Sequence, residues 1–171
     1  MRRLLLLRHA KSSWGDRGLD DHDRPLAPRG EKAAALIGDY LAQRGPLPSL
    51  ALCSSARRTR DTLERLIARL PEPPEVVQAR ELYLASVNEV LGQIRRAPDA
   101  HAVLLVVGHH PTTQALALQL SGRGDPQALR RLRAKFPTGA LAELRFAAER
   151  WGDLEPGAGE LHAFCTPKEL G

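Results

Sequence analysis

The stretch Leu4-Leu5-Leu6-Leu7-Arg8-His9 decides the expected fold, together with Val103-Leu104-Leu105-Val106-Val107-Gly108-His109. In each stretch a short apolar run ends in a histidine. A continuous apolar run of this length is typical of a strand that is buried on both faces of a parallel sheet. Ligands of open parallel sheets bind beyond the carboxyl ends of the strands. We therefore expect both histidines at the edge of the sheet where a ligand binds.

The rest of the chain alternates between strand and helix patterns. Strands are expected at Arg3–Leu7, Ser49–Cys53, Glu75–Gln78, His101–Val107, Ala140–Phe146 and Glu160–Cys165, the last as an edge strand. Helices are expected over 29–44, 59–70, 87–96 and 112–120, where apolar residues recur at helical spacing. This alternation predicts an α/β fold, a three-layer α/β/α sandwich with a mainly parallel central sheet.

Length and composition limit the classes of function. The 171 residues predict a single domain, and the net charge of +5 comes mainly from 21 arginines against 4 lysines. Arginine binds phosphate oxygens through its planar fork, so this excess fits an anionic substrate, although most of these arginines are expected to form a solvated basic surface. The few aromatic residues are not clustered with the arginines, which argues against a nucleic-acid surface.

Two further features of the sequence concern the cellular compartment of the protein. Cys53 and Cys165 lie far apart in apolar contexts without the spacing of a zinc site, so we expect two reduced thiols and a cytoplasmic protein. The first apolar run is too short for a signal peptide or a membrane span, so no membrane association is expected.

A third element joins the two histidines. The segment from Ser54 to Arg60 follows the second expected strand and begins the 59–70 helix, so its arginines point toward the same edge of the sheet. A single histidine after a strand usually lies at the surface or caps a helix, but two such strand ends beside an arginine-rich turn favour a shared pocket. These patterns do not distinguish Arg57 from Arg58 as the residue that faces the pocket.

The segment from Arg8 to Trp14, Arg-His-Ala-Lys-Ser-Ser-Trp, resembles the Arg-His-Gly signature of the histidine phosphatase superfamily. It is most similar to the short bacterial branch of SixA-type phosphohistidine phosphatases. Further matching segments follow in the expected order over nearly the whole chain: Asp21–Leu26, Ser54–Thr62, Leu82–Ser86, Gly108-His109 and Phe136–Ala140. The resemblance implies a phosphoglycerate mutase-like fold and one histidine phosphatase domain over residues 1–171.

The resemblance also implies roles for individual residues. His9 is expected to be the nucleophile that takes up the phosphoryl group, and Arg8 a clamp on the phosphate. The family's Ser-x-x-x-Arg spacing, read from Ser54, selects Arg58 as the second clamp. His109 is expected to hold phosphoryl oxygens. Glu81 falls near the position where larger relatives carry a catalytic acid. No cofactor or metal is implied, because the phosphohistidine intermediate is hydrolysed by water.

Two positions depart from the pattern of the branch. His110 stands where the branch often has asparagine; it could reach the leaving group of a substrate, but we expect it to be a surface or capping residue. Ala27 stands where a serine or threonine is expected as the cap before Pro28, which should weaken the start of that helix by about 1 kcal/mol.

The expected function is hydrolysis of phosphohistidine on a partner protein. Phosphohistidine releases imidazole, which leaves readily, so its hydrolysis does not require a well-defined catalytic acid. A phosphate ester releases an alkoxide, which needs a proton donor. Only 48 residues lie between His9 and Arg58, and 27 between Glu81 and His109, which leaves little room for a cap over the site. Two alternatives stay open: a phosphatase or mutase that acts on a small phosphate ester, and a basic module that binds phosphate without turnover.

Overall fold

The four leucines at 4–7 form the centre of strand β1 (Arg2–Arg8) in the computed structural model, which describes residues 1–171. All four are buried, with Leu4 and Leu6 in one hydrophobic core and Leu5 and Leu7 in another. Successive side chains of a strand point to opposite faces, so an unbroken apolar run means that both faces of the sheet are covered.

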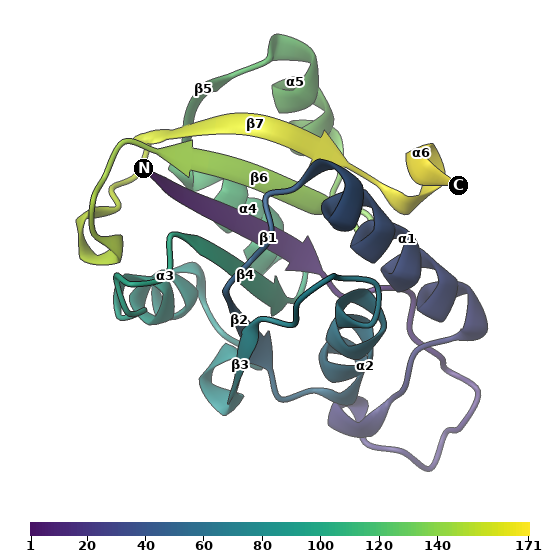
Figure 1. The fold of residues 1–171 in the computed structure, drawn as a ribbon. Helices are drawn as coiled ribbons and strands as arrows, with labels where there is room; N and C mark the ends of the chain where they lie inside the picture. The colour runs from purple at the N-terminus through teal and green to yellow at the C-terminus, as the bar shows by residue number, and fades with distance from the viewer.

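One seven-stranded sheet runs through the molecule in the order β3-β2-β4-β1-β6-β7-β5 (Figure 1). Only β6 runs antiparallel to its neighbours. Besides β1, the strands are β2 (Leu50–Ser54), β3 (Glu75–Ala79), β4 (Val103–Gly108), β5 (Ser121–Gly124), β6 (Leu141–Phe146) and β7 (Gly159–Cys165). The prediction of a three-layer α/β fold with a mainly parallel sheet is therefore confirmed.

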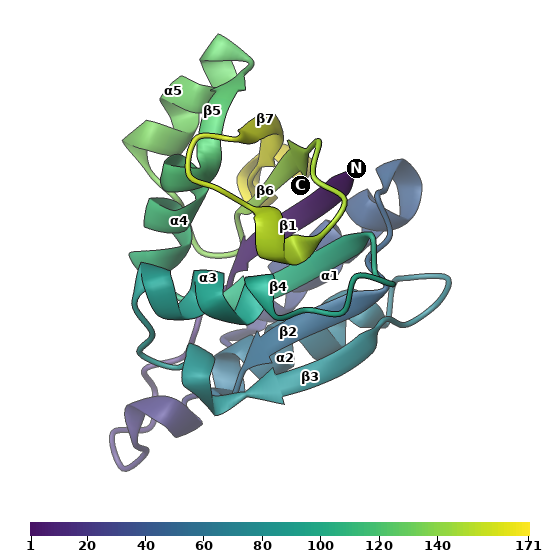
Figure 2. The same cartoon turned by 90° about the vertical axis from the view of Figure 1, so that its left-hand side faces the viewer.

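Helices cover both faces of the sheet (Figures 1 and 2). One layer holds α1 (Pro28–Arg44), α2 (Arg57–Ile67) and the short α6 (Pro167–Leu170). The other holds α3 (Val87–Arg95), α4 (Thr112–Leu120) and α5 (Pro126–Ala134). Three short 3-10 turns, Asp21–Asp23, Arg80–Leu82 and Trp151–Asp153, lie in the connections.

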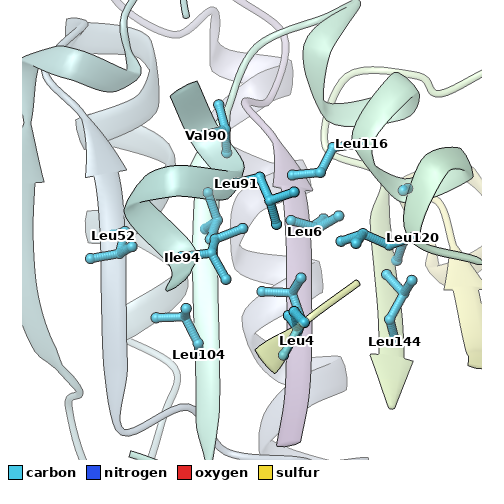
Figure 3. Close-up of a cluster of buried hydrophobic side chains, with 14 of the residues drawn as sticks. Leu4, Leu6, Leu52, Val90, Leu91, Ile94, Leu104, Leu116, Leu120 and Leu144 are labelled. Atoms are coloured by element: carbon cyan, nitrogen blue, oxygen red, sulfur yellow. The ribbon is translucent and has the colours of Figure 1, made fainter. Parts of the chain in front are cut away.

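The larger core lies between the sheet and the α3–α4–α5 layer. Figure 3 shows Leu4 and Leu6 of β1 facing Leu91 of α3 and Leu116 of α4. A fully buried leucine contributes about 1.5–3 kcal/mol to folding. The central strand is thus anchored from both sides, which fixes the position of the Arg8-His9 dipeptide that follows it.

The late part of the sheet differs from the sequence-based expectation. Glu160–Cys165 is predicted as an edge strand, but β7 lies between β6 and β5, and β5 forms the edge. The pattern predicts neither β5 nor α5. The sequence of β5, Ser-Gly-Arg-Gly, has no apolar alternation that would mark a strand. For α5 a usable signal exists, since the Asp125 side chain caps the helix and Pro126 is its first residue.

The start of α1 has the expected weakness. Ala27 occupies the N-cap with extended backbone, and no side chain accepts a hydrogen bond from the first amides of the helix. By contrast, α3 begins with a capping box, in which Ser86 accepts from the Glu89 amide and Glu89 accepts from the Ser86 amide.

These two helix starts yield a paired prediction about stability. Ala27→Ser should raise the free energy of unfolding by about 1 kcal/mol, because the new hydroxyl satisfies an amide that α1 leaves unpaired. Ser86→Ala should lower it by about the same amount. Urea denaturation of both variants and the wild type measures the effect. An unchanged or lower stability of Ala27→Ser would contradict this account of the α1 start.

Candidate active site

The two strand-end histidines are brought together by the pairing of β1 with β4. The strands are parallel neighbours, and their register aligns Arg8 with Gly108. One residue beyond this pair, the His9 amide donates a hydrogen bond to the Gly108 carbonyl at 3.1 Å. As a result the rings of His9 and His109 lie with their centroids 5.5 Å apart.

The backbone of Arg8 and His9 is held from a third side by the segment before β6. The Gly139 amide donates to the carbonyls of both residues, at 3.1 and 2.9 Å. The Arg8 amide donates to the Ala140 carbonyl at 3.1 Å. Gly139 has a φ of 76°, a conformation that glycine adopts without strain. The segment Phe136–Ala140 therefore fixes the dipeptide that carries two of the predicted site residues.

The ring of His9 is fixed in one orientation. Its Nδ1 lies 2.7 Å from the Ala10 carbonyl, which can only accept, so the neutral ring carries its proton on Nδ1. The Nε2 atom is left with a free lone pair. The amide of Ala10 in turn donates to the Thr62 hydroxyl of α2 at 3.0 Å. His9 is only 7% exposed, so the lone pair belongs to a nearly buried, rigidly held nitrogen.

Arg8 and Arg58 each have an unsatisfied donor. Arg8 Nη1 donates to the Phe136 carbonyl at 2.8 Å, but its Nε is buried without a partner. The Nε of Arg58 is also buried without a partner. These are the only two buried side-chain nitrogen or oxygen atoms in the protein with no hydrogen bond. Unpaired buried donors are costly, so two charged ones beside the same histidine pair indicate a site for an anion.

The structure distinguishes between the two arginines that the sequence pattern leaves open. Arg58 is 7% exposed, and its Nη2 lies 3.4 Å from Nδ1 of His109. Arg57 points away, with its side chain 50% exposed and its Nε 3.6 Å from the Asp61 carboxylate. Arg58 is therefore the member of the pair that joins His9, His109 and Arg8. We refer to these four residues as the strand-end cluster.

Both nitrogens of His109 are engaged. Arg58 Nη2 can only donate, so Nδ1 of His109 accepts, and the proton on Nε2 is donated to the Ser54 hydroxyl at 2.8 Å. Ser54 is the last residue of β2, so three neighbouring parallel strands contribute to the cluster. In this arrangement His109 has no free N–H for a phosphoryl oxygen. It can donate a hydrogen bond to such an oxygen only after it gains a proton on Nδ1 or gives up one of its present partners.

Sequence reasoning assigned no role to Asp21, which holds the Arg58 guanidinium in place. Its carboxylate accepts from Arg58 Nη2 at 3.1 Å, from Tyr83 at 2.7 Å and from Arg24 at 3.0 Å. The bond from Tyr83, with those from the two guanidiniums, lowers the pKa of Asp21 to about 2. Asp21 is therefore a permanent negative charge beside the clamp. The segment Asp21–Leu26 matches the family and so pointed to this part of the sequence, but it did not indicate the contact between Asp21 and Arg58.

The two histidines are neutral at physiological pH. Burial, together with the smaller effect of the Arg58 and Arg8 guanidiniums, lowers the pKa of His9 to about 4, although the bond to Ala10 acts in the opposite direction. Burial followed by the charge of Arg58 lowers the pKa of His109 to about 3. For His9, burial is the larger cause and the arginines are secondary. A neutral His9 is the form that can act as a nucleophile.

Two candidates, Glu81 and His110, make no side-chain hydrogen bond to the cluster, although His110 lines a pocket beside His109. Glu81 is exposed on the Arg80–Leu82 turn, and no hydrogen bond or ion pair joins its carboxylate to the four residues. Its role as an acid stays a prediction. His110 is exposed and caps nothing through its side chain, because α4 has Pro111 at its N-cap without a side-chain hydrogen bond.

Comparisons with known proteins agree with the sequence resemblance. The model of the histidine phosphatase superfamily (branch 1) matches residues 4–84. An uncharacterized protein of Mycobacterium tuberculosis is 43% identical over 164 residues, which cover 95% of this chain and 100% of that protein.

Solved structures give the same result. A putative phosphohistidine phosphatase SixA from Nakamurella multipartitia is 34% identical, with a TM-score of 0.85 over 97% of this chain and 96% of that one. A second putative SixA, from Agrobacterium tumefaciens, is 30% identical, with a TM-score of 0.81 over 97% and 98% of the two chains. The protein histidine phosphatase SixA in complex with tungstate is 21% identical, with a TM-score of 0.79 over 99% of each chain, and shares the fold.

The histidine environments yield a prediction about titration. In NMR spectra of ring-labelled protein, His9 should stay neutral down to about pH 4 and His109 to about pH 3. Because both values lie below the unfolded value of about 6.5, the unfolded chain binds these protons first. The protein should therefore lose stability as the pH falls from about 6.5 toward 4. A midpoint near 6.5 for either ring would contradict the described burial.

Proposed function

Because the chain belongs to the histidine phosphatase superfamily and is of the SixA type, we propose that it hydrolyses phosphohistidine on a partner protein, with His9 as the nucleophile. The observation that carries the proposal is the strand-end cluster itself. A neutral, buried imidazole with a free Nε2 lone pair lies beside two guanidiniums whose Nε donors have no partner. One bound phosphoryl group would use all three atoms.

In the proposed first step, Nε2 of His9 attacks the phosphorus atom in line with the bond to the leaving group. The new P–N bond forms on His9 while the P–N bond of the substrate breaks, and the leaving imidazole takes up a proton. Charge in such transition states is spread over the equatorial oxygens, so the protein acts through positioning and electrostatic stabilisation. Arg8 and Arg58 supply fixed positive charge for these oxygens.

In the proposed second step, water attacks the phosphohistidine on His9, the P–N bond breaks, and inorganic phosphate leaves with His9 again neutral. The phosphoryl dianion beside His109 favours protonation of that ring, because an adjacent negative charge raises a histidine pKa. Protonated His109 would then donate to a phosphoryl oxygen through Nδ1, while Nε2 keeps its bond to Ser54. No metal takes part in either step as we propose it.

The position of Glu81 favours phosphohistidine over an ester as the substrate. An alkoxide needs a proton from a nearby acid, whereas imidazole, with a pKa of about 6.5, leaves with little assistance. Glu81 is exposed and outside the cluster, so the site supports the substrate with the better leaving group. Hydrolysis of small phosphate esters, with Glu81 as the catalytic acid, remains the alternative. Phosphate binding without turnover is a weaker alternative, because it gives the His9 lone pair no role.

Three further predictions concern the domain organisation, the cellular location and the partners of the protein. We propose a single histidine phosphatase domain over residues 1–171, since β1 and β7 belong to one sheet. Cys53 and Cys165 are buried free thiols, which supports the proposed cytoplasmic location. None of the helices has the length and apolar character that crossing a membrane requires. Nucleic acid is not proposed as a partner.

Trapping of the phosphoenzyme tests the nucleophile. After incubation with radiolabelled phosphohistidine peptide and a rapid quench, wild-type protein should carry label that acid removes and alkali does not. His9→Ala should carry none, and its turnover should fall by roughly 10⁶-fold, the loss measured when a hydrolase loses its nucleophile. Turnover is measured with and without a chelator, and the two rates should be equal.

The exposed His162 on β7 provides the matched control. His162→Gln should keep both the label and the wild-type rate. Label that persists in His9→Ala, or that resists acid in the wild type, would disprove the proposed intermediate.

Glu81→Gln separates the two substrate classes. We expect turnover of a phosphohistidine peptide to change by less than about threefold, since imidazole does not need an acid. Acid catalysis of ester cleavage would instead be reduced by roughly 10²–10⁴-fold in this variant. Rates are measured with a phosphohistidine peptide and with a sugar phosphate. A fast sugar-phosphate reaction that collapses in the variant would favour the small-ester alternative.

A further inference from the structure

A pocket of about 230 Å³ adjoins the strand-end cluster and includes His109 in its lining. Beyond His109 the walls are mainly apolar, formed chiefly by Leu82, Leu84, Val90, Pro111 and Leu116, and the other polar side chains in the lining are His110, Thr112 and Thr113. The lining contains no Asp, Glu, Lys or Arg. The cluster and the pocket thus divide the site into a cationic part that fits a phosphoryl group and an uncharged part beside it.

The chemistry of the pocket restricts its occupant. A sugar or carboxylated metabolite would bring most of its hydroxyl or charged groups against leucine, valine and proline, where they lose their hydration without a partner. The hydroxyls of Thr112 and Thr113 already donate to the Ala85 and His109 carbonyls, so they offer no free donor to such a ligand. An apolar group gains from leaving water there. Pockets for whole drug-sized ligands measure roughly 300–1,000 Å³, so this smaller pocket suits one side chain.

Leu84 extends the apolar surface from the pocket to the solvent. Its side chain is 81% exposed, the most exposed of the large hydrophobic residues. Its backbone has a φ of 58°, which makes it the only residue other than glycine with a positive φ. For a leucine this left-handed conformation is strained, because its Cβ lies too close to the following carbonyl oxygen. Burial does not account for a strained, exposed leucine, and such strain concentrates at binding sites.

We propose that the pocket and Leu84 together bind an apolar side chain of the partner protein, next to the phosphohistidine whose phosphoryl group occupies the strand-end cluster. The inference rests on the proposed function and defines its substrate class as phosphohistidine in an apolar sequence context. A protein partner fits because the apolar surface continues past the pocket onto exposed Leu84, where a helix or loop that carries the phosphohistidine would lie.

Matched phosphohistidine peptides test the inference. In one set, each of the four positions on either side of the phosphohistidine is leucine in turn, and in the other set it is aspartate. At one or more positions the wild-type protein should prefer leucine by roughly tenfold or more in kcat/KM, since burying a leucine side chain is worth about 1.5–3 kcal/mol. Leu84→Asn should reduce that preference, because asparagine tolerates the left-handed backbone but removes the apolar contact.

Two controls separate the possible results. The phosphoramidate ion has no side chain to place in the pocket, so each variant's peptide rates are divided by its own phosphoramidate rate to isolate the effect on the pocket. Leu47→Asn changes another exposed leucine, which precedes β2 at the end of the strand opposite to Ser54, and should leave the peptide preference intact. Circular dichroism of both variants checks that they are folded.

Several outcomes would overturn the inference. Equal rates for all leucine and aspartate peptides, or an unaltered preference in Leu84→Asn, would refute the pocket assignment while the proposed function stands. A Leu84-dependent preference for small apolar esters, without peptide turnover, would replace the protein partner with a small molecule. Failure to hydrolyse phosphoramidate and every peptide would disprove the proposed function, and the inference with it.

Discussion

The parallel pairing of β1 with β4 is the constraint on which the candidate site depends. The register that aligns Arg8 with Gly108 places His9 and His109 side by side, and the apolar strands behind them are buried on both faces. A shift of this register by one residue would turn every leucine of β1 to the opposite face. The hydrophobic core thus sets the geometry of the histidine pair, because the pattern that folds the sheet also fixes where the strands end.

The second requirement is electrostatic. The guanidiniums of Arg8 and Arg58 would repel each other, and Asp21 offsets part of this charge through its bond to Arg58. The Nε donors of Arg8 and Arg58 nevertheless lack partners. These two donors are available to an anion, and electrostatic stabilisation of that kind, arranged before the substrate binds, promotes phosphoryl transfer.

The sequence predicted the parts of the structure that follow from periodicity and failed where tertiary contacts decide. The α/β class, the central strands and the strand ends of His9 and His109 follow from continuous apolar runs. Strand β5 was missed because Ser-Gly-Arg-Gly pairs through its backbone, and β7 was wrongly placed at the edge in consequence. The contacts of Asp21 with Tyr83 and Arg58 join residues 62 and 37 positions apart, which no local pattern encodes.

A crystal structure with bound orthophosphate would test the central claim most directly. The account predicts the phosphorus atom facing Nε2 of His9, with phosphate oxygens accepting hydrogen bonds from Nε of Arg8 and Nε of Arg58. It also predicts that His109 Nδ1 turns from an acceptor of Arg58 into a donor to the phosphate. Phosphate bound elsewhere, with both arginine Nε atoms still unpartnered, would contradict it.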